Sequence, residues 1–277
     1  MSFRVLISND DGIDAPGIKA LYSEVKKVAD PIVVGPTTER SAVGHGISVF
    51  NDMALVEKRK NGKVWGYGLE GTPADCVKFA ITHILKEVPD LVLSGINRGQ
   101  NAGNNIIYSG TVAAALEGTM FGIPSIALSL AVSRDDKEMH FADAAHYSAR
   151  LAKMVHRKGL PEGILLNVNF PNVPENQYQG IAVTRQGKSM FEDFFEHKGI
   201  VNGLPSFRNI GGKIRRTPHE GDFDDIVLEQ NKISITPLHY DLTHHKLRME
   251  LDKWVREDVT EELFQIREEM EPENDQG

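Results

Sequence analysis

Short, almost wholly apolar runs alternate with longer segments of helical period along the first 170 residues. The runs "RVLIS" at 4–8 and "PIVVG" at 31–35 are typical of strands that are covered on both faces. Between them, residues 17–29 place apolar side chains at helical spacing. This alternation predicts an α/β fold with a doubly wound, mostly parallel sheet. Further helices are expected at 72–85, 111–122 and 141–159, and further strands at 90–96, 124–132 and 163–170.

The chain departs from this alternation in two places. Residues 47–69 predict a hairpin that turns at Asn61-Gly62, a dipeptide favoured in such turns. Residues 186–232 are rich in glycine, charge and aromatic side chains and lack a helical period, which indicates an extended β-hairpin arm. We expect a single domain over 1–277, with a core at 1–185, the arm at 186–232, a return strand at 233–245, and an amphipathic C-terminal helix with a frayed tail at 246–277.

Large apolar side chains in the arm need a surface that covers them, because a lone extended hairpin buries little by itself. The arm could fold back on its own domain. Exchange of such an element between subunits is a low-cost route to a dimer, so we favour a subunit interface. These apolar residues are Phe191, Phe194, Phe195, Ile200 and Phe207.

Composition and charge narrow the function classes. A net charge of -8 argues against a surface that neutralises a nucleic-acid backbone, so no nucleic-acid polymer is expected as a partner. The single cysteine, Cys76, excludes an intrachain disulfide framework, and Met1 is not followed by a signal-like segment. These features predict a cytoplasmic protein. The longest apolar runs are much shorter than the ~20 residues that a membrane span requires, so no membrane association is expected.

Polar residues gather where predicted strands end, which is where ligands bind in open α/β sheets. The adjacent Asp10 and Asp11 could be an ordinary turn and helix cap, but two neighbouring carboxylates repel unless a cation lies between them. Ser41 and Asn97, after two other strands, also have ordinary explanations as a capping serine and an Asx turn. Together the four would form an all-oxygen shell that suits Mg²⁺ or Mn²⁺ rather than zinc.

A second feature lies at the start of the Ala-rich helix expected at 111–122. Ser109, Gly110 and Thr111 precede or open this helix, where unpaired backbone N–H groups and the helix dipole favour an anion. The plain alternative, Thr111 as the N-cap, is compatible with the same geometry. The segment therefore predicts a phosphate site that faces the metal if the loops converge.

One motif is misleading. Gly66, Gly68 and Gly71 match the G-x-G-x-x-G pattern of dinucleotide-binding folds, but they lie on an expected hairpin strand rather than in the first strand-to-helix turn. A nicotinamide site, and hence a dehydrogenase, is the least supported functional hypothesis. Thr72 and Asp75 are better explained as the N-cap and the acid of a capping box.

Histidines give no decisive signal. His239 lies in an apolar strand and could be a core residue, and His45 lies in the loop after the second strand. His244 and His245 are expected at an exposed helix start. None of the four has the spacing of a zinc ligand set.

Five segments, in order along the chain, are similar to the signature segments of the SurE (survival protein E) 5′/3′-nucleotidase family. The resemblance covers residues 3 to 245. It implies a Rossmann-like three-layer α/β/α sandwich that uses a divalent cation to hydrolyse nucleoside monophosphates, and a homodimer or homotetramer built through an exchanged C-terminal arm. The segments are "ISNDDGIDAPGI", "RSAVGHGIS", "GTPADCV", "LVLSGINRGQNAGNNIIYSGTVAAALEG" and "ISITPLHYDLT".

The resemblance also implies roles for individual residues. One divalent cation per subunit, Mg²⁺ or Mn²⁺, would be held by Asp10, Asp11, Ser41 and Asn97. Asn9 and Asn101 match polar positions that line the site, and Ser109, Gly110 and Thr111 match the phosphate-facing turn.

One departure from the family pattern concerns catalysis. Where many members carry an acidic pair in the glycine-rich loop, this chain has Asn104 and Asn105. The general base therefore stays open between Asp10 and His239. The expected activity is hydrolysis of nucleoside 5′- and 3′-monophosphates by water. The alternative is a non-catalytic, metal-dependent nucleotide sensor.

Overall fold

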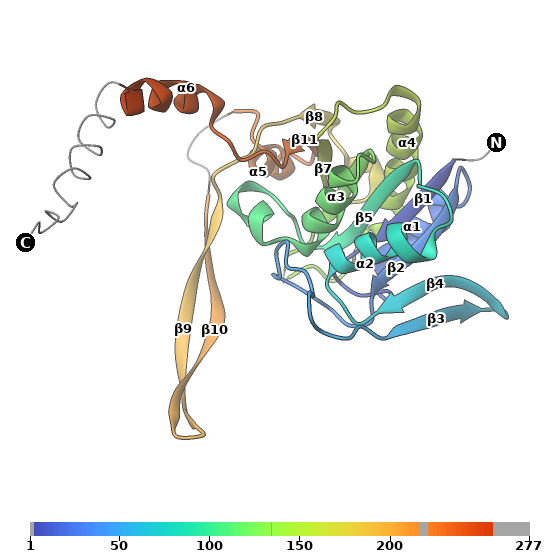
Figure 1. Ribbon diagram of the computed structural model, residues 1–277, viewed down its shortest axis with the longest axis horizontal. Helices are drawn as coiled ribbons and strands as arrows, with labels where there is room; N and C mark the ends of the chain where they lie inside the picture. Colours follow the sequence, from blue (N-terminus) through green and yellow to red (C-terminus); the bar gives the residue numbers. More distant parts are fainter. Residues whose placement is uncertain (1–2, 134, 217–220, 257–277) are drawn as a thin grey trace, which may run out of the picture. The chain divides into compact units, whose positions relative to one another are not determined.

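The computed structural model describes residues 3–133, 135–216 and 221–256 (Figure 1). The chain divides into a first unit that ends at Tyr240 and a second that begins at Asp241. The first unit contains the sheet, its covering helices and the hairpin arm.

A mixed sheet forms the centre of the first unit, and within the described residues it has nine strands. Neighbouring strands from β4 to β7 all run parallel, whereas β3 and β11 pair antiparallel with β4 and β7. This arrangement confirms the predicted α/β class. In pairing order the strands are β3 (Leu55–Lys60), β4 (Lys63–Leu69), β2 (Asp30–Pro36), β1 (Arg4–Ser8), β5 (Leu91–Arg98), β6 (Ser125–Ala131), β7 (Ile164–Pro171), β11 (Ile233–His239) and β8 (Ile181–Val183).

The strand order reverses at β1. The chain proceeds from β1 outward through β2 to β4 on one side, then crosses to β5 and proceeds through β6 to β7 on the other side. At the carboxyl ends of β1 and β5, the connection that follows β1 therefore leads to one side of the sheet, and the connection that follows β5 leads to the other side. In open parallel sheets this switch point leaves a crevice in which ligands bind.

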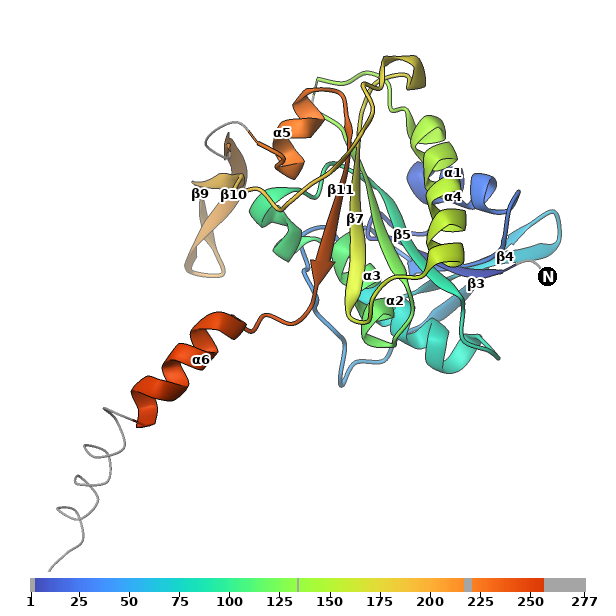
Figure 2. The same ribbon diagram turned by 90° about the horizontal axis from the view of Figure 1, so that it is seen from above.

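Helices cover both faces, and the alternation of side chains along β1 shows why. Val5 and Ile7 belong to the core beneath α1 (Pro16–Val25) and α4 (Phe141–Lys158), whereas Leu6 points to the other face. That second face is covered by α2 (Pro73–Phe79) and α3 (Gly110–Met120). Figure 2 shows α1 and α4 together on one side of the sheet. The three-layer sandwich is thus confirmed.

Local details differ from the predictions in two places. The helix expected at 72–85 is α2 followed by a π-helical turn, η1 (Ala80–Ile84). The first hairpin starts at Leu55 rather than at residue 47, and its turn is at Asn61-Gly62 as predicted, with both φ angles positive. The capping box of Thr72 and Asp75 is confirmed.

Within the arm predicted at 186–232, a long antiparallel hairpin of β9 (Met190–Val201) and β10 (Leu204–Arg215) projects from the body of the first unit (Figure 1). The hairpin is shorter than predicted, because a short helix lies at 224–229 in the same range. Phe194, Phe195 and Phe207 are 52%, 68% and 61% exposed, so the arm does not fold back to bury them. The side chain of Phe191 lies outside the described residues. The remaining short helices of the first unit are η2 (Gly103–Tyr108), η3 (Glu175–Gln177) and α5 (Asp224–Glu229).

The second unit begins with α6 (His245–Trp254). Its N-cap is His244, whose Nδ1 accepts a hydrogen bond from the Leu247 N–H at 3.0 Å, so the tandem histidines open an exposed helix as predicted. The predicted continuation of the helix and its tail, 257–277, lies outside the described residues. No helix in the described ranges is long and apolar enough to span a membrane.

Candidate active site

Three strand ends meet at the switch point. Asp10 and Asp11 follow β1 after a single residue, Asn9, and Asn97 is the penultimate residue of β5. The backbone N–H of Arg98 donates to Asp11 Oδ2 at 2.8 Å, which joins the end of β5 to the carboxylate pair. The loop after β2 is joined in the same way, because the N–H of Arg40 donates to the Asp10 carbonyl at 2.8 Å.

The Asp10 carboxylate lies against the N-terminus of α3 and is only 5% exposed. The Thr111 N–H donates to Asp10 Oδ2 at 3.1 Å, and the Thr111 hydroxyl donates to Oδ1. Gly110 permits this approach, since a Cβ there would lie 2.9 Å from the Asp10 Cβ. The helix dipole and two hydrogen bonds therefore stabilise negative charge on Asp10.

Burial nevertheless raises the pKa of both carboxyl groups. It raises the pKa of Asp10 to about 6, against the lowering effect of the Thr111 hydroxyl and with a further increase from the charge of Asp11. Burial also raises the pKa of Asp11, against the hydrogen bond from the Arg98 N–H and with an added effect of Glu39. The negative charge of the pair is thus only partly neutralised by the protein, as in a site that takes a cation.

The donor chemistry around the pair fits a hard cation. The Asn9 side chain donates from Nδ2 to the Gly12 carbonyl at 2.8 Å, while its Oδ1 is buried without a hydrogen-bond partner. The described residues contain no group of three or more His, Cys, Asp or Glu that could hold a metal, so a site here depends on two carboxylates and neutral oxygens. Such a ligand set suits Mg²⁺ or Mn²⁺.

Ser41 and Asn97 lie beside this site, and each has a local partner in this structure. The exposed Ser41 hydroxyl donates to Glu39 Oε1 at 2.6 Å. Asn97 Nδ2 donates to the Gly99 carbonyl at 2.8 Å, which leaves the amide oxygen of Asn97 directed away from that carbonyl. Ser41 is the next residue after Arg40, so its loop is anchored on Asp10 even though its hydroxyl points to Glu39.

The start of α3 differs in detail from the prediction. Ser109 rather than Thr111 is the N-cap, because Ser109 Oγ accepts a hydrogen bond from the Val112 N–H at 3.1 Å. Both donors of Thr111 are engaged with Asp10. The anion that the helix N-terminus holds in this structure is therefore the Asp10 carboxylate.

Asn101 belongs to a buried polar network that the sequence did not reveal. Its Nδ2 donates to Ser129 Oγ at 2.8 Å, and its N–H donates to Asn169 Oδ1 at 2.8 Å. Its carbonyl accepts a hydrogen bond from Asn167 Nδ2 at 2.7 Å. Asn167 and Asn169 are two residues apart in the apolar run of β7, so they share a face, and this pattern could have indicated their joint role.

The structure does not bring His239 to the carboxylate pair. His239 pairs with Ile164 at the amino end of β7, because β11 runs antiparallel to the other central strands. It therefore lies at the sheet edge opposite to the switch point, and its side chain is exposed.

His45 has a partner that its sequence context did not show. Its Nε2 lies 2.7 Å from Oε2 of Glu117, a carboxylate on α3 that is 4% exposed. Asn104 is one of the two asparagines that replace the acidic pair of the family pattern. Its backbone N–H donates to the Ser189 carbonyl at 2.8 Å. Asn104 and Asn105 are both half-buried.

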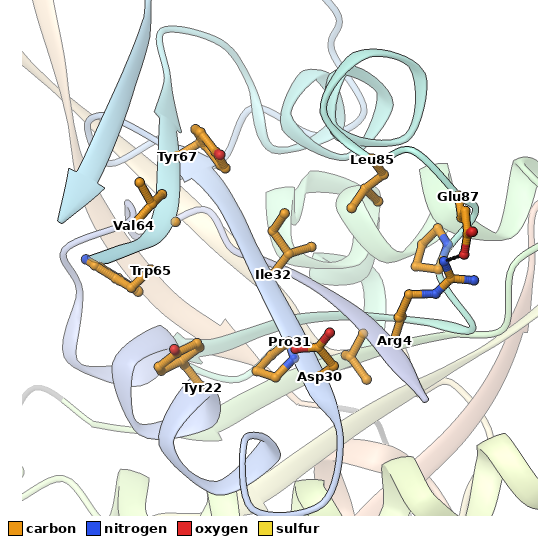
Figure 3. A pocket seen from close by; sticks show the side chains of 13 residues that line it. Arg4, Tyr22, Asp30, Pro31, Ile32, Val64, Trp65, Tyr67, Leu85 and Glu87 are labelled. Atoms are coloured by element: carbon orange, nitrogen blue, oxygen red, sulfur yellow. Dashed lines mark hydrogen bonds and ion pairs between the residues drawn. The ribbon is translucent and has the colours of Figure 1, made fainter. Parts of the chain in front are cut away.

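A separate cavity of about 310 Å³ lies at the amino edge of the sheet (Figure 3). Its lining includes Arg4 and Asp30, the first residues of β1 and β2, together with Trp65 near the start of β4. Asp10 follows the opposite end of β1. This cavity is therefore distinct from the candidate active site.

Comparisons with known proteins agree on one family. The family model described as survival protein SurE matches residues 5–193. A protein of Carboxydothermus hydrogenoformans named 5′-nucleotidase SurE is 43% identical over 257 residues, covering 91% of this chain and 96% of its own. A protein of Chlorobium chlorochromatii with the same name is 40% identical over 251 residues, covering 91% of each chain. The crystal structure of the SurE protein from Aquifex aeolicus matches with a TM-score of 0.77 and 37% identity, over 91% of this chain and 99% of that one.

Proposed function

Because the chain belongs to the SurE family, we propose that it is a divalent-metal-dependent nucleotidase that hydrolyses nucleoside 5′- and 3′-monophosphates to nucleoside and phosphate. The observation that carries this proposal is the pair of the buried Asp10 and the half-buried Asp11 at the switch point, held between the end of β5 and the N-terminus of α3. This pair supports a cation site next to a helix start that favours anions.

The residues that would hold one Mg²⁺ or Mn²⁺ per subunit are Asp10, Asp11, Ser41 and Asn97. Such a cation supplies Lewis-acid activation of water and neutralisation of phosphate charge. To join the set, the Ser41 hydroxyl would have to give up its hydrogen bond to Glu39.

Within one chain, Asp10 is the better candidate for the general base. In the metal-free protein, burial raises the pKa of this carboxyl group to about 6, so it can accept a proton near neutral pH. Thr111 orients this carboxylate through two hydrogen bonds, so its reactive oxygen has a defined direction. A role of His239 as the general base stays a prediction. The position of His239 near the amino end of β7 does not support it.

Substrate binding is proposed for Asn9, Asn101, Ser109, Gly110 and Thr111. Support comes from the lack of a side chain at Gly110, which lets Asp10 pack directly against the first turn of α3, so this turn adjoins the carboxylate pair. The asparagines of β7 hold the backbone of Asn101, which supports a fixed position for the loop that carries it.

The test is phosphate release from a panel of nucleoside 5′- and 3′-monophosphates with Mg²⁺, Mn²⁺ or a chelator. Wild type should release phosphate only with metal, and Asp11→Asn should lower kcat/KM at least ~10²-fold because it removes one of two charged ligands. Asp14→Asn is the matched control, since Asp14 is an exposed partner of Lys58 outside the site. Full metal-dependent turnover by Asp11→Asn would contradict the proposal.

The sensor alternative is decided by the same experiment. Nucleotide binding with metal but without phosphate release would identify a sensor, and no observation above favours that outcome. We also propose a homodimer or homotetramer that associates through the exchanged arm, supported by the exposed phenylalanines of β9 and β10. A cytoplasmic location, supported by the single cysteine, stays a prediction.

A further inference from the structure

Asp224 is a buried carboxylate outside the carboxylate pair. Asp224 is fully buried at the start of α5. Its Oδ2 accepts a hydrogen bond from the Gly103 N–H at 3.0 Å, and its Oδ1 accepts one from the Gly187 N–H at 2.8 Å. A third backbone donor is the N–H of Asp225, at 2.9 Å from Oδ1.

These hydrogen bonds join two segments that are far apart in the sequence. Gly103 lies in the glycine-rich loop after β5, which carries Asn101, whereas Gly187 lies just before β9 of the arm. The same two segments make two further contacts. The Asn104 N–H donates to the Ser189 carbonyl at 2.8 Å, and Gln186 Nε2 donates to the Gly103 carbonyl at 3.0 Å.

The packing at this junction leaves little space for movement. Gly103 has a φ of +59°, and a Cβ on it would lie 2.3 Å from Ser189 Oγ and 2.6 Å from the Ser189 carbonyl oxygen. The glycine-rich loop is therefore in direct backbone contact with the base of the arm. On its other side the loop is held by Asn167 and Asn169 of β7.

The residue type at 224 is matched to this arrangement. A carboxylate has two oxygens that only accept hydrogen bonds, so it can serve three N–H donors at once. An asparagine has one such oxygen, and its amide N–H₂ would face one of the glycine N–H groups. Burial raises the pKa of the Asp224 carboxyl group, and the backbone donors Gly103 and Gly187 offset part of this desolvation cost.

We propose that Asp224 is a positioning residue for the nucleotidase reaction: it fixes the glycine-rich loop against the base of the arm, so that Asn101 and the preceding Asn97 keep their places in the site. This inference rests on the proposed function for its link to catalysis. The hydrogen bonds of the Asp224 carboxylate go to Gly103, Gly187 and Asp225, so its effect on the site would pass through the glycine-rich loop.

The test compares Asp224→Asn with Asp222→Asn in the full chain. Asp222 is a matched control, because it lies two residues before Asp224 and its exposed carboxylate pairs with Arg185. Three quantities are measured for each: KM and kcat for a nucleoside monophosphate, Mn²⁺ affinity by titration calorimetry without substrate, and amide hydrogen exchange by mass spectrometry.

Asp224→Asn should raise KM and weaken Mn²⁺ binding by roughly 5–30-fold, the range expected for one lost hydrogen bond to a buried charge. The maximal rate should change less than KM. Exchange should increase in peptides that cover 99–108 and 186–190, with β1 and α1 unchanged. Asp222→Asn should match wild type in all three.

Wild-type KM and Mn²⁺ affinity in folded Asp224→Asn would overturn the inference, and so would faster exchange spread over the whole chain. If Asp224→Asn does not fold, Gln186→Ala removes a milder contact of the same loop and should shift the same quantities in the same direction; wild-type values for it would then overturn the inference. If wild type releases no phosphate, the proposed function fails, while Mn²⁺ affinity and exchange still decide the role of Asp224.

Discussion

At the residue scale, Asp10 combines two demands that oppose each other. A metal ligand or base must be buried and oriented, and Thr111 and Gly110 provide this. Burial and the neighbouring charge of Asp11 make the ionised form costly, which is why the pKa of Asp10 rises to about 6. Functional sites often retain such a cost in stability.

Asp10→Asn should therefore stabilise the metal-free protein at pH 8 while it abolishes metal-dependent turnover. Because the pKa is higher in the folded than in the unfolded state, ionisation of Asp10 lowers the free energy of unfolding above pH 6, and protonation restores it as the pH falls through 6. Asparagine is neutral throughout. We expect a gain of about 1–2 kcal/mol at pH 8, seen as a higher Tm, that shrinks toward pH 5.

Asp14→Asn is the control with the opposite sign. The hydrogen bond from Lys58 lowers the pKa of the exposed Asp14, so its loss should slightly lower the Tm at neutral pH. A metal-free Asp10→Asn protein that is less stable than wild type at pH 8 would show that the hydrogen bonds of Thr111 outweigh the cost of burying the charge.

At the element scale, the loop after β2 owes its position to contacts with helices. Gly46 accepts a hydrogen bond from the Thr72 hydroxyl at 2.7 Å, and the Ser48 N–H donates to Asp75 Oδ1 at 2.9 Å. His45 adds its contact with the buried Glu117 of α3. The loop that carries Ser41 is thus attached to α2 and α3 together.

His45→Ala should loosen this loop and so weaken the contribution of Ser41 to the metal site. We expect the Mn²⁺ concentration for half-maximal activity to rise about 10-fold, in the range found for residues that orient metal ligands. The measurement is a metal titration of phosphate release at saturating nucleotide. His83→Ala is the control, because His83 stacks on Phe79 and does not contact the loop. An unchanged titration in His45→Ala would remove the proposed role.

At the scale of the whole molecule, the arm is the feature that a single chain leaves unexplained. A two-stranded hairpin with three phenylalanines more than half exposed is not stable alone in water. Its base is joined to the glycine-rich loop through Asp224. Association through the arm would therefore affect the position of the loop that carries Asn101.

The paired substitution Phe195→Glu and Phe207→Glu should convert an oligomer to a monomer, because charges buried in an apolar interface cost more than the contact returns. Molar mass by light scattering at micromolar concentration measures this. Val88→Glu, at a site that is 61% exposed outside the arm, should leave the mass unchanged. A monomeric wild type at this concentration would contradict association through the arm.

Local sequence determined those features that depend on neighbouring residues. The apolar runs specified the strands and the α/β class, the turn at Asn61-Gly62 follows from its own backbone preferences, and Thr72 with Asp75 forms its capping box within four residues. The sequence also indicated Asp10 and Asp11 as candidate metal ligands, since a hard cation relieves the repulsion between adjacent carboxylates.

Which groups meet across long stretches of sequence depends on how the whole chain packs. Because β11 runs antiparallel to β7, His239 lies near the amino end of β7, away from the switch point. The N-terminus of α3 packs against Asp10, so the Asp10 carboxylate accepts the Thr111 N–H. The network around Asn101 and the junction at Asp224 join segments separated by more than 60 residues. Such contacts depend on strand order and direction, which are set by packing of the whole chain and leave no periodic signal in any one segment.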